Sequence, residues 1–272
     1  MTGVGRVFGQ ERYSARFEWG PSGADAVAAG AAFVAVVDVL SFTTALSVAV
    51  ENGVAVMPYP WRDGTEVAAA ARYDAELAVG RSAAGPDEIS LSPAAIRRVA
   101  TGRRIERLVL PSPNGSAICA RLSAAGSARP AGEAVTVLGV CLRNAAIAGE
   151  WVRARLAGRP VAVVAAGERW PDGSLRPAVE DLWGAGAFLA GFSDLSPEAE
   201  SAVAAYRAVA GRVPAALAAA ASGRELAALD HPGAAARSFA EDVAIAAEVD
   251  ASTAVPVLQD GWFRRAEPTP PG

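Results

Sequence analysis

Short apolar runs that end in polar turns, each followed by a helical segment, recur along the chain. The run from 33 to 37 reads FVAVV. It has no alternation and is too short and too Val-rich for a helix, so it predicts a buried strand covered on both faces. Asp38 and a cluster of hydroxyls follow it, and the apolar segment from 45 to 50 predicts a helix that ends at Asn52-Gly53. The stretch therefore predicts a strand, a tight polar turn and a helix packed back on the sheet.

The same strand-turn-helix pattern is predicted three more times. The strands are expected at 107–110, 134–138 and 160–165, and the turns after them hold Pro111 to Ser116, Asn144, and Gly167-Glu168. Other strands are expected at 13–19, 54–57, 77–79 and 254–258, with a polar loop at 169–178. Alternating strands and helices are typical of α/β proteins. We therefore predict a layered α/β/α fold with a mixed, largely parallel sheet.

The C-terminal third differs in character from the rest of the chain. Residues 196 to 250 are rich in alanine and mostly helical in pattern. We predict an α/β core at 1–195 that holds the site, a mostly helical part at 196–265 packed on it, and a disordered tail at 266–272 with the sequence AEPTPPG. The boundary rests on Gly191 and Pro197.

Composition removes several classes of enzyme. The chain has no lysine, which excludes Schiff-base chemistry and the Walker A motif. A single histidine disfavours a Ser-His-Asp triad and excludes a site with several histidine ligands. Cys119 and Cys141 do not have zinc-site spacing, and we expect both to be small buried hydrophobes in a reducing compartment.

Charge and hydropathy bear on partners and location. The net charge is −4 and the isoelectric point is about 5.2, with no basic patch suited to nucleic acid. No apolar run approaches the roughly 20 residues of a spanning helix, and no signal peptide is visible at the start. We expect a cytoplasmic protein with no nucleic-acid or membrane partner, and a homo-oligomer is compatible with the sequence.

The polar turns carry the candidate chemistry. If their strands are parallel, the turns share one edge of the sheet, where helix N-termini suit an anion such as phosphate. Magnesium prefers one or two carboxylates together with waters and phosphate oxygens. Three carboxylates are candidates for holding it: Asp38, Glu180 and Asp181.

Each of these groups also has a plain structural interpretation. Asp38 can cap a turn, and the Ser and Thr hydroxyls and Asn144 can cap helices. Glu180-Asp181 is a favourable pair at a helix start, and Asn114-Gly115 is a common turn dipeptide. Two phosphatase types are not matched: Leu40 stands where an Asp-x-Asp motif needs its second aspartate, and neither cysteine has an arginine six positions later.

The ordered set of motifs resembles a known family. The motifs are Asp38-Val39-Leu40 with Thr43-Thr44, Asn114-Gly115-Ser116, Asn144-Ala145, Ala166-Gly167, Glu180-Asp181 and Val255-Pro256. Over roughly residues 33 to 260 they resemble the 2-phosphosulfolactate phosphatase (ComB) family. The resemblance implies an α/β fold and Mg²⁺-dependent hydrolysis of a small anionic phosphorylated hydroxy acid, 2-phosphosulfolactate, to sulfolactate and phosphate.

The resemblance also implies roles for residues. It implies catalytic roles for Asp38, Asn114 and Glu180, and Mg²⁺ binding by Asp38, Glu180 and Asp181. Phosphate binding is expected from Thr43, Thr44, Gly115, Ser116 and Asn144. The attacking nucleophile is left open between water and Asp38.

Three positions depart from the family pattern. Ser41 stands where the family usually has an arginine, Arg81 where it has an acid, and Leu91 where it has an asparagine. A serine cannot grip phosphate with two parallel hydrogen bonds as an arginine does, and Arg81 or Arg143 are candidates to replace that charge. The alternative function is a catalytically degenerate relative that binds an anionic metabolite or acts as a partner subunit. A dinucleotide-binding oxidoreductase is a weaker alternative, because no G-x-G-x-x-G follows any strand.

Overall fold

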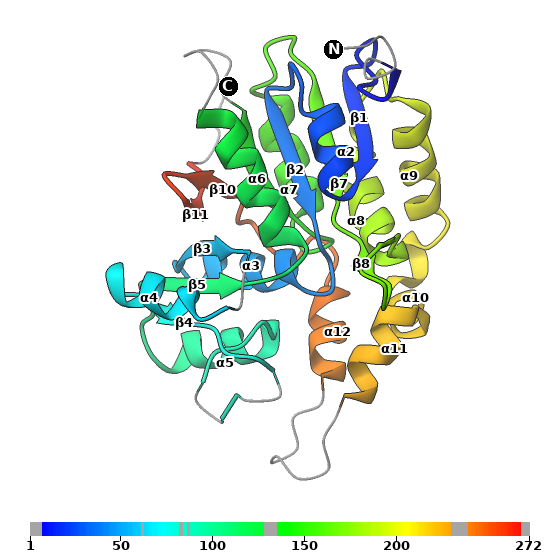
Figure 1. Cartoon of the computed structure of the whole chain (residues 1–272). Coiled ribbons are helices and arrows are strands. Elements are labelled where there is room, and N and C mark those ends of the chain that lie inside the picture. Colours follow the sequence, from blue (N-terminus) through cyan, green and yellow to red (C-terminus); the bar gives the residue numbers. More distant parts are fainter. Residues whose placement is uncertain are drawn as a thin grey trace.

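The computed structural model describes residues 7–60, 63–81, 84–85, 88–127, 135–229 and 239–267. Figure 1 shows a central sheet with helices on both sides and a mostly helical C-terminal part lying along one side. The predicted layered α/β/α fold with a mixed, largely parallel sheet is confirmed. In the part of the chain described here, no helix combines the length and the apolar character that crossing a membrane requires.

The main sheet has nine strands in the order β1-β7-β2-β6-β10-β11-β3-β5-β4. In sequence order they are β1 (Ala15–Trp19), β2 (Phe33–Val37), β3 (Ala55–Tyr59), β4 (Glu76–Leu77), β5 (Arg107–Pro111), β6 (Thr136–Val140), β7 (Val161–Ala165), β10 (Pro256–Gln259) and β11 (Trp262–Arg265). A separate small hairpin is formed by β8 (Glu168–Arg169) and β9 (Leu175–Arg176).

The sheet consists of two parallel blocks joined by a hairpin. The first block is β1, β7, β2 and β6, and the second is β3, β5 and β4. Between them lies the hairpin β10–β11, which pairs antiparallel with β6 on one side and with β3 on the other. Along the sheet the two blocks therefore run in opposite directions.

This arrangement corrects the assumption that the polar turns share an edge because all their strands are parallel. β5 is not parallel to β2, yet the carboxyl ends of the two strands meet. In Figure 1, β2 points down into the middle of the molecule and β5 points to the same place from the side. The contact is direct, because the N–H of Gly115 donates to Asp38.

Helices pack on both faces of the first block, and others pack against the second block or against neighbouring helices. The helices are α2 (Gly20–Val27), α3 (Phe42–Glu51), α4 (Thr65–Arg72), α5 (Pro93–Gly102), α6 (Gly115–Ser127), α7 (Ala145–Arg153), α8 (Val179–Leu189), α9 (Pro197–Arg207), α10 (Val213–Ala219), α11 (Ala221–Ala228) and α12 (Ala240–Ala246), with a short 3-10 turn at Ala210–Arg212. Along β2, Val34 and Val36 face α2, α3 and α6, while Ala35 and Val37 face α7 and α8. The strand is buried on both faces, as its unbroken apolar run predicts.

Two elements were missing from the sequence prediction. The hairpin β8–β9 lies in the segment predicted to be a polar loop, and β11 follows the predicted last strand. The pair β10–β11 also places residues 256–265 in the middle of the main sheet rather than on its outside. The division into a core and a helical part stays a prediction, and most of the predicted tail, residues 268–272, lies outside the described residues.

Candidate active site

Asp38 lies at the point where the two blocks meet. Its side chain follows the last residue of β2 and is only 6% exposed. One carboxylate oxygen accepts the N–H of Phe42, at the start of α3, at 3.1 Å, and the other accepts the N–H of Gly115, at the start of α6, at 2.9 Å. The capping role that the sequence allowed for Asp38 is therefore present, and it joins two helix N-termini to one carboxylate.

Gly115 is required by this close approach. A Cβ atom at this position would lie 2.5 Å from the Phe42 ring and 2.8 Å from the Asp38 carboxylate, which is too short for either contact. A side chain at 115 would therefore push α6 away from Asp38. The dipeptide Asn114-Gly115 is thus more than a turn, since the glycine gives its N–H to the site.

Asp181 ties together the ends of two neighbouring strands. Its two oxygens accept the N–H of Val39, after β2, at 2.7 Å and the N–H of Gly167, after β7, at 2.8 Å. Gly167 has φ +66, and a Cβ there would lie 2.9 Å from the backbone oxygen of Arg176. Asp181 was predicted to be a metal ligand. In the structure, both of its oxygens bond to backbone N–H groups and hold these two turns in place.

Glu180 and Glu168 complete a cluster of acids with Asp38 and Asp181. We call these four residues the acidic cluster. Glu180 is 2% exposed and has no hydrogen-bond or ion-pair partner among the described residues. Glu168, in β8, is partly buried and accepts a hydrogen bond of 3.0 Å from the side-chain amide of Asn114.

The pKa values of Asp38, Glu168 and Asp181 are raised above those of isolated carboxylates. Burial raises the pKa of Asp38 to about 6, against the lowering effect of its two backbone hydrogen bonds and of Arg81. Burial first, and the charge of Asp38 second, raise the pKa of Glu168 to about 7. The same two causes raise the pKa of Asp181 well above its usual range. Several negative charges thus share a small desolvated volume, which is typical of functional sites.

The hydroxyls predicted to bind phosphate lie beside Asp38, but they are engaged by the backbone. Thr43, Thr44 and Ser116 are fully buried. Their hydroxyls donate to the carbonyls of Asp38, Val39 and Leu110, respectively. These three side chains therefore stabilise the two turns by bonding to the backbone.

Asn144 occupies the helix start that the sequence predicted but does not cap the helix with its side chain. Its oxygen accepts the N–H of Cys141, and its amide donates to the carbonyls of Gly139 and Ala254. The side chain is fully buried. It fastens the turn after β6 to the segment that leads into β10, and it does not bond to any member of the acidic cluster.

The two candidate arginines lie in different places. Arg143 bonds to Ser47, Glu51 and Glu248, and Glu248 also pairs with Arg97. We call Arg143, Glu51, Glu248 and Arg97 the arginine network; within the described residues, none of these bonds is to Asp38. Arg81 instead bonds to the hydroxyl of Ser41 and lowers the pKa of Asp38.

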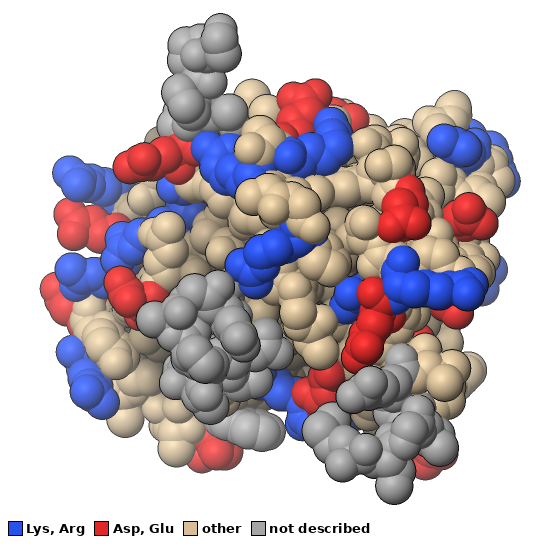
Figure 2. All heavy atoms as spheres, turned by 90° about the horizontal axis from the view of Figure 1, so that it is seen from above, with Lys and Arg blue, Asp and Glu red and all other residues tan. Residues whose placement is uncertain are grey.

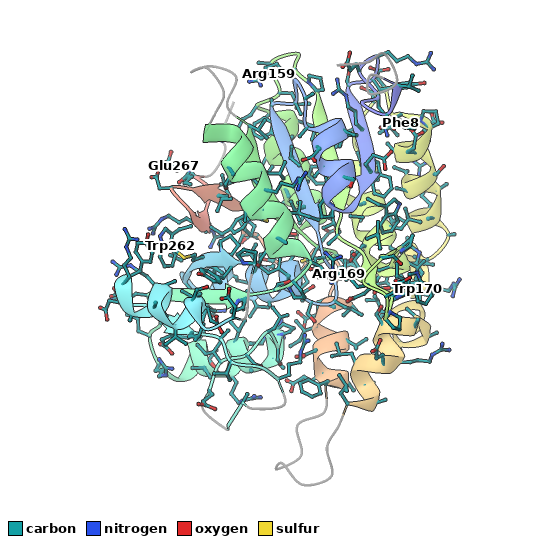
Figure 3. The ribbon with its side chains drawn as sticks, viewed as in Figure 1. Phe8, Arg159, Arg169, Trp170, Trp262 and Glu267 are labelled. Carbon is teal, nitrogen blue, oxygen red and sulfur yellow. The ribbon has the colours of Figure 1, made fainter. Side chains whose placement is uncertain are left out.

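Glu168 was placed in a polar turn from the sequence but given no role, and Arg176 was not identified as a site residue. Both lie in the hairpin β8–β9, where they pair across the two strands. Arg176 also bonds to Ser222 in α11 at 2.8 Å. Figure 3 labels Arg169 and Trp170 in this hairpin, and Trp170 is 53% exposed at the outer side of the molecule. The available signal was Gly167-Glu168 in the turn that follows a buried strand, since this turn lies at the carboxyl end of β7 as Asp38 lies at that of β2.

The donor set fits a hard cation that takes few protein ligands. Among the described residues, no group of three or more His, Cys, Asp or Glu side chains is arranged to hold a metal by itself. Glu180 nevertheless offers a buried carboxylate with no other partner in the described chain, and each oxygen of Asp38 uses one of its two acceptor positions. Mg²⁺ commonly takes one or two carboxylates and completes its shell with water and phosphate.

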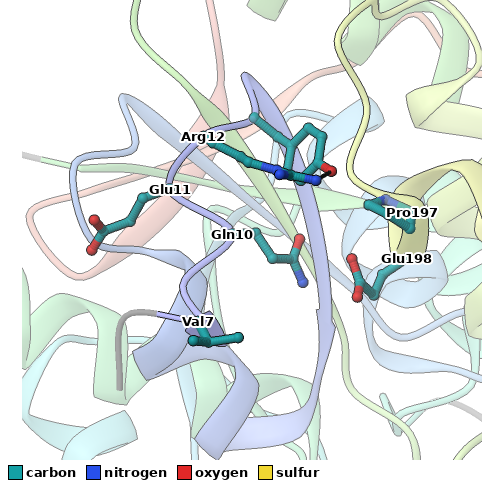
Figure 4. Close-up of a pocket in the computed structure, with 7 residues that line it drawn as sticks. Val7, Gln10, Glu11, Arg12, Pro197 and Glu198 are labelled. Atoms are coloured by element: carbon teal, nitrogen blue, oxygen red, sulfur yellow. Dashed lines mark hydrogen bonds between the residues drawn. The ribbon is translucent and has the colours of Figure 1, made fainter. Parts of the chain in front are cut away.

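Other surfaces carry less chemistry. A hollow near the N-terminus lies between the segment before β1 and the start of α9, and Figure 4 shows Gln10, Arg12 and Glu198 among its lining residues. The amide of Gln10 is already used by the backbone of Phe17. On the described part of the face in Figure 2, arginines and acids are mixed, without a large patch of one sign.

Comparison with known proteins gives one match. A family model described as 2-phosphosulpholactate phosphatase matches residues 23–261. None of the curated proteins matches the chain. The matched range includes every described strand of the main sheet except β1 and β11, and it contains all four residues of the acidic cluster.

Proposed function

Because the chain belongs to the 2-phosphosulpholactate phosphatase family, we propose that it is a Mg²⁺-dependent phosphatase that hydrolyses a small phosphorylated hydroxy acid. The substrate proposed from the family is 2-phosphosulfolactate, which would give sulfolactate and phosphate. The observation that carries this proposal is the acidic cluster, built where two strand ends and two helix N-termini converge. Burying several carboxylates without balancing cations costs free energy, and a bound cation would offset that cost.

In this proposal Asp38 and Glu180 hold Mg²⁺, and Asp181 braces the turns that carry them. A bound Mg²⁺ would polarise the phosphoryl group and offset its negative charge. Asp38 is placed for this by the N–H groups of Phe42 and Gly115, which fix the orientation of its carboxylate. Glu180 is placed by the first turn of α8.

Asn114 and Glu168 form the part of the site that would act on water and the leaving group. The amide of Asn114 orients Glu168 through the 3.0 Å hydrogen bond. The pKa of Glu168 at about 7 is suited to proton transfer near neutral pH. We propose that water is the nucleophile, because both oxygens of Asp38 are held by backbone N–H groups.

The test is phosphate release from 2-phosphosulfolactate and a panel of other phosphorylated hydroxy acids, with Mg²⁺ and with EDTA. Release is expected with Mg²⁺ only, and Asp38→Asn is expected to lower kcat at least about 1000-fold. Asp194→Asn is the matched control, because Asp194 also accepts two hydrogen bonds, from Ser14, but lies at the surface. Release that persists in Asp38→Asn would refute this assignment.

A non-catalytic relative that binds an anionic metabolite is the second candidate, favoured by Ser41 at the position after Leu40. A folded protein that gains thermal stability with the phosphorylated acids but releases no phosphate from any of them would establish this second candidate. The two functions are therefore separated by the same panel of compounds.

A further inference from the structure

Arg81 reaches the candidate active site from the second block of the sheet. It follows β4, bonds to the hydroxyl of Ser41 and donates to the carbonyl of Leu91 at 3.0 Å. Ser41 is the residue immediately before α3 and is 3% exposed. The guanidinium of Arg81 therefore lies beside the start of α3, at the same helix N-terminus that Asp38 contacts through Phe42.

Asp242 faces this guanidinium from the first turn of α12. The side chain is fully buried. One oxygen is fixed by the hydroxyl of Ser92 at 2.6 Å and the N–H of Ala94 at 3.1 Å. The other oxygen lies 3.7 Å from Nε of Arg81 and has no hydrogen-bond partner within the described chain. Asp242 is thus anchored to α5 with one oxygen and faces Arg81 with the other.

Burial and charge hold Arg81 and Asp242 next to each other. A fully buried carboxylate is stable only with a partner, and Arg81 is the cation that acts on it. The guanidinium also lies over the ring of Phe239, with its Cζ 5.8 Å from the ring centre. The Arg81 side chain is still 21% exposed, so an anion can approach it from solvent.

We propose that Arg81 binds the phosphate of the substrate beside the N-terminus of α3, and that Asp242 is the positioning residue that holds its guanidinium there. This inference rests on the proposed function for the identity of the anion. It assigns to Arg81 the phosphate grip that Ser41 cannot provide. It excludes Arg143 from that role, since Arg143 is held by Glu51, Ser47 and Glu248.

The test measures inorganic phosphate as a competitive inhibitor and as a ligand in a thermal shift assay, together with kcat and KM for the best substrate of the panel. Arg81→Ser is expected to weaken phosphate binding at least tenfold and to raise KM more than it lowers kcat. Asp242→Asn keeps the acceptor for Ser92 and Ala94, and it is expected to raise KM severalfold. Arg81→Lys, which keeps the charge but not the fork, is expected to fall between wild type and Arg81→Ser.

The double variant Ser41→Arg with Arg81→Ser tests the geometry. Arg81 touches Ser41, so an arginine at 41 reaches the same place and is expected to restore phosphate binding. Arg97→Ser is the matched control, because Arg97 is also a partly exposed arginine in an ion pair, with Glu248. Its phosphate affinity is expected to equal that of wild type.

The outcomes separate this inference from the proposed function. Phosphate binding that is equal in Arg81→Ser and wild type, or absent in wild type, would overturn the role of Arg81. An unchanged KM in Asp242→Asn would overturn the role of Asp242. A wild type that binds phosphate through Arg81 but hydrolyses no member of the panel would refute the proposed function and leave the inference standing.

Discussion

The turns after β2 and β6 are neighbours, since the two strands pair along their length, and each is close to a set of charged side chains. The arginine network lies beside the turn after β6, and Arg143 at its centre is only 3% exposed. Its two arginines face two glutamates, so its charges balance. The acidic cluster beside the turn after β2 has four acids, and the cation that acts on Asp38 lies at its edge.

The difference between the arginine network and the acidic cluster shows how charges that stabilise this fold can be told apart from charges that serve a function. In the arginine network, hydrogen bonds of 2.6–3.2 Å repay the cost of burial. In the acidic cluster, burial instead raises the pKa of Asp38, Glu168 and Asp181. The first set holds helices together, and the second keeps an electrostatic cost that a bound cation would remove.

Among the variants that test this comparison, the largest expected effect is the loss of activity in Glu180→Gln. The substitution removes a buried charge that has no partner in the described chain. Phosphate release is expected to fall at least about 100-fold, while the urea midpoint stays equal or rises, because a buried charge is gone. Steady-state kinetics and urea unfolding measure the two effects. A destabilised variant with full activity would place Glu180 among the structural charges.

Arg143→Met is expected to show the opposite pattern. It removes the three hydrogen bonds of a buried guanidinium and leaves Glu51 and Glu248, each about one-third exposed, without this partner, so the free energy of unfolding should fall by roughly 2 kcal/mol. Activity per folded molecule should not change. Arg97→Ala removes the more exposed arginine of the same network, and its cost should stay below about 1 kcal/mol. A rise in KM for Arg143→Met at unchanged stability would contradict the comparison.

The pH dependence of stability gives the next effect, in protein stripped of metal with EDTA. The raised pKa values mean that the native state binds more protons than the unfolded chain between about pH 5 and about pH 8. The free energy of unfolding should therefore fall as pH rises through this window, by roughly 2 kcal/mol. Asp38→Asn should flatten part of the slope. If stability instead increases with pH in this window, the negative charges of the acidic cluster are already balanced by other groups of the metal-free protein.

The smallest expected effect is at the surface pair of Arg121 and Asp25. Both side chains are about half exposed, at 54% and 48%, so water screens their attraction. Arg121→Ala should leave the urea midpoint and kcat/KM unchanged within error. A clear loss of stability would mean that the exposure of an ion pair does not determine how much it contributes to the stability of this protein.

The sequence contained most of the fold but less of the site. The unbroken apolar runs predicted β2, β5, β6 and β7, because strands covered on both faces have this pattern. The opposite direction of the second block was not predictable, since it depends on where the late hairpin β10–β11 pairs. Local patterns do not contain that information.

The site shows the same limit at the level of side chains. Asp38 and Gly115 could be found because each follows a strand, and both lie where the blocks meet. The hydroxyl of Thr44 was expected to face phosphate, but it bonds to the carbonyl of Val39. A motif states which atoms are available, and only packing decides which partner each atom takes. Glu168 was placed in a polar turn but given no role, because the hairpin that begins with it was not predicted.

The hairpin at the centre of the sheet also determines the order in which the molecule can assemble. Residues 256–265 follow both blocks in the sequence, and they join β6 to β3. During synthesis, both blocks keep an unpaired edge until this hairpin leaves the ribosome, and such edges promote association between chains. We therefore expect folding to be limited by this long-range closure, with the acidic cluster forming only when the hairpin has joined the blocks.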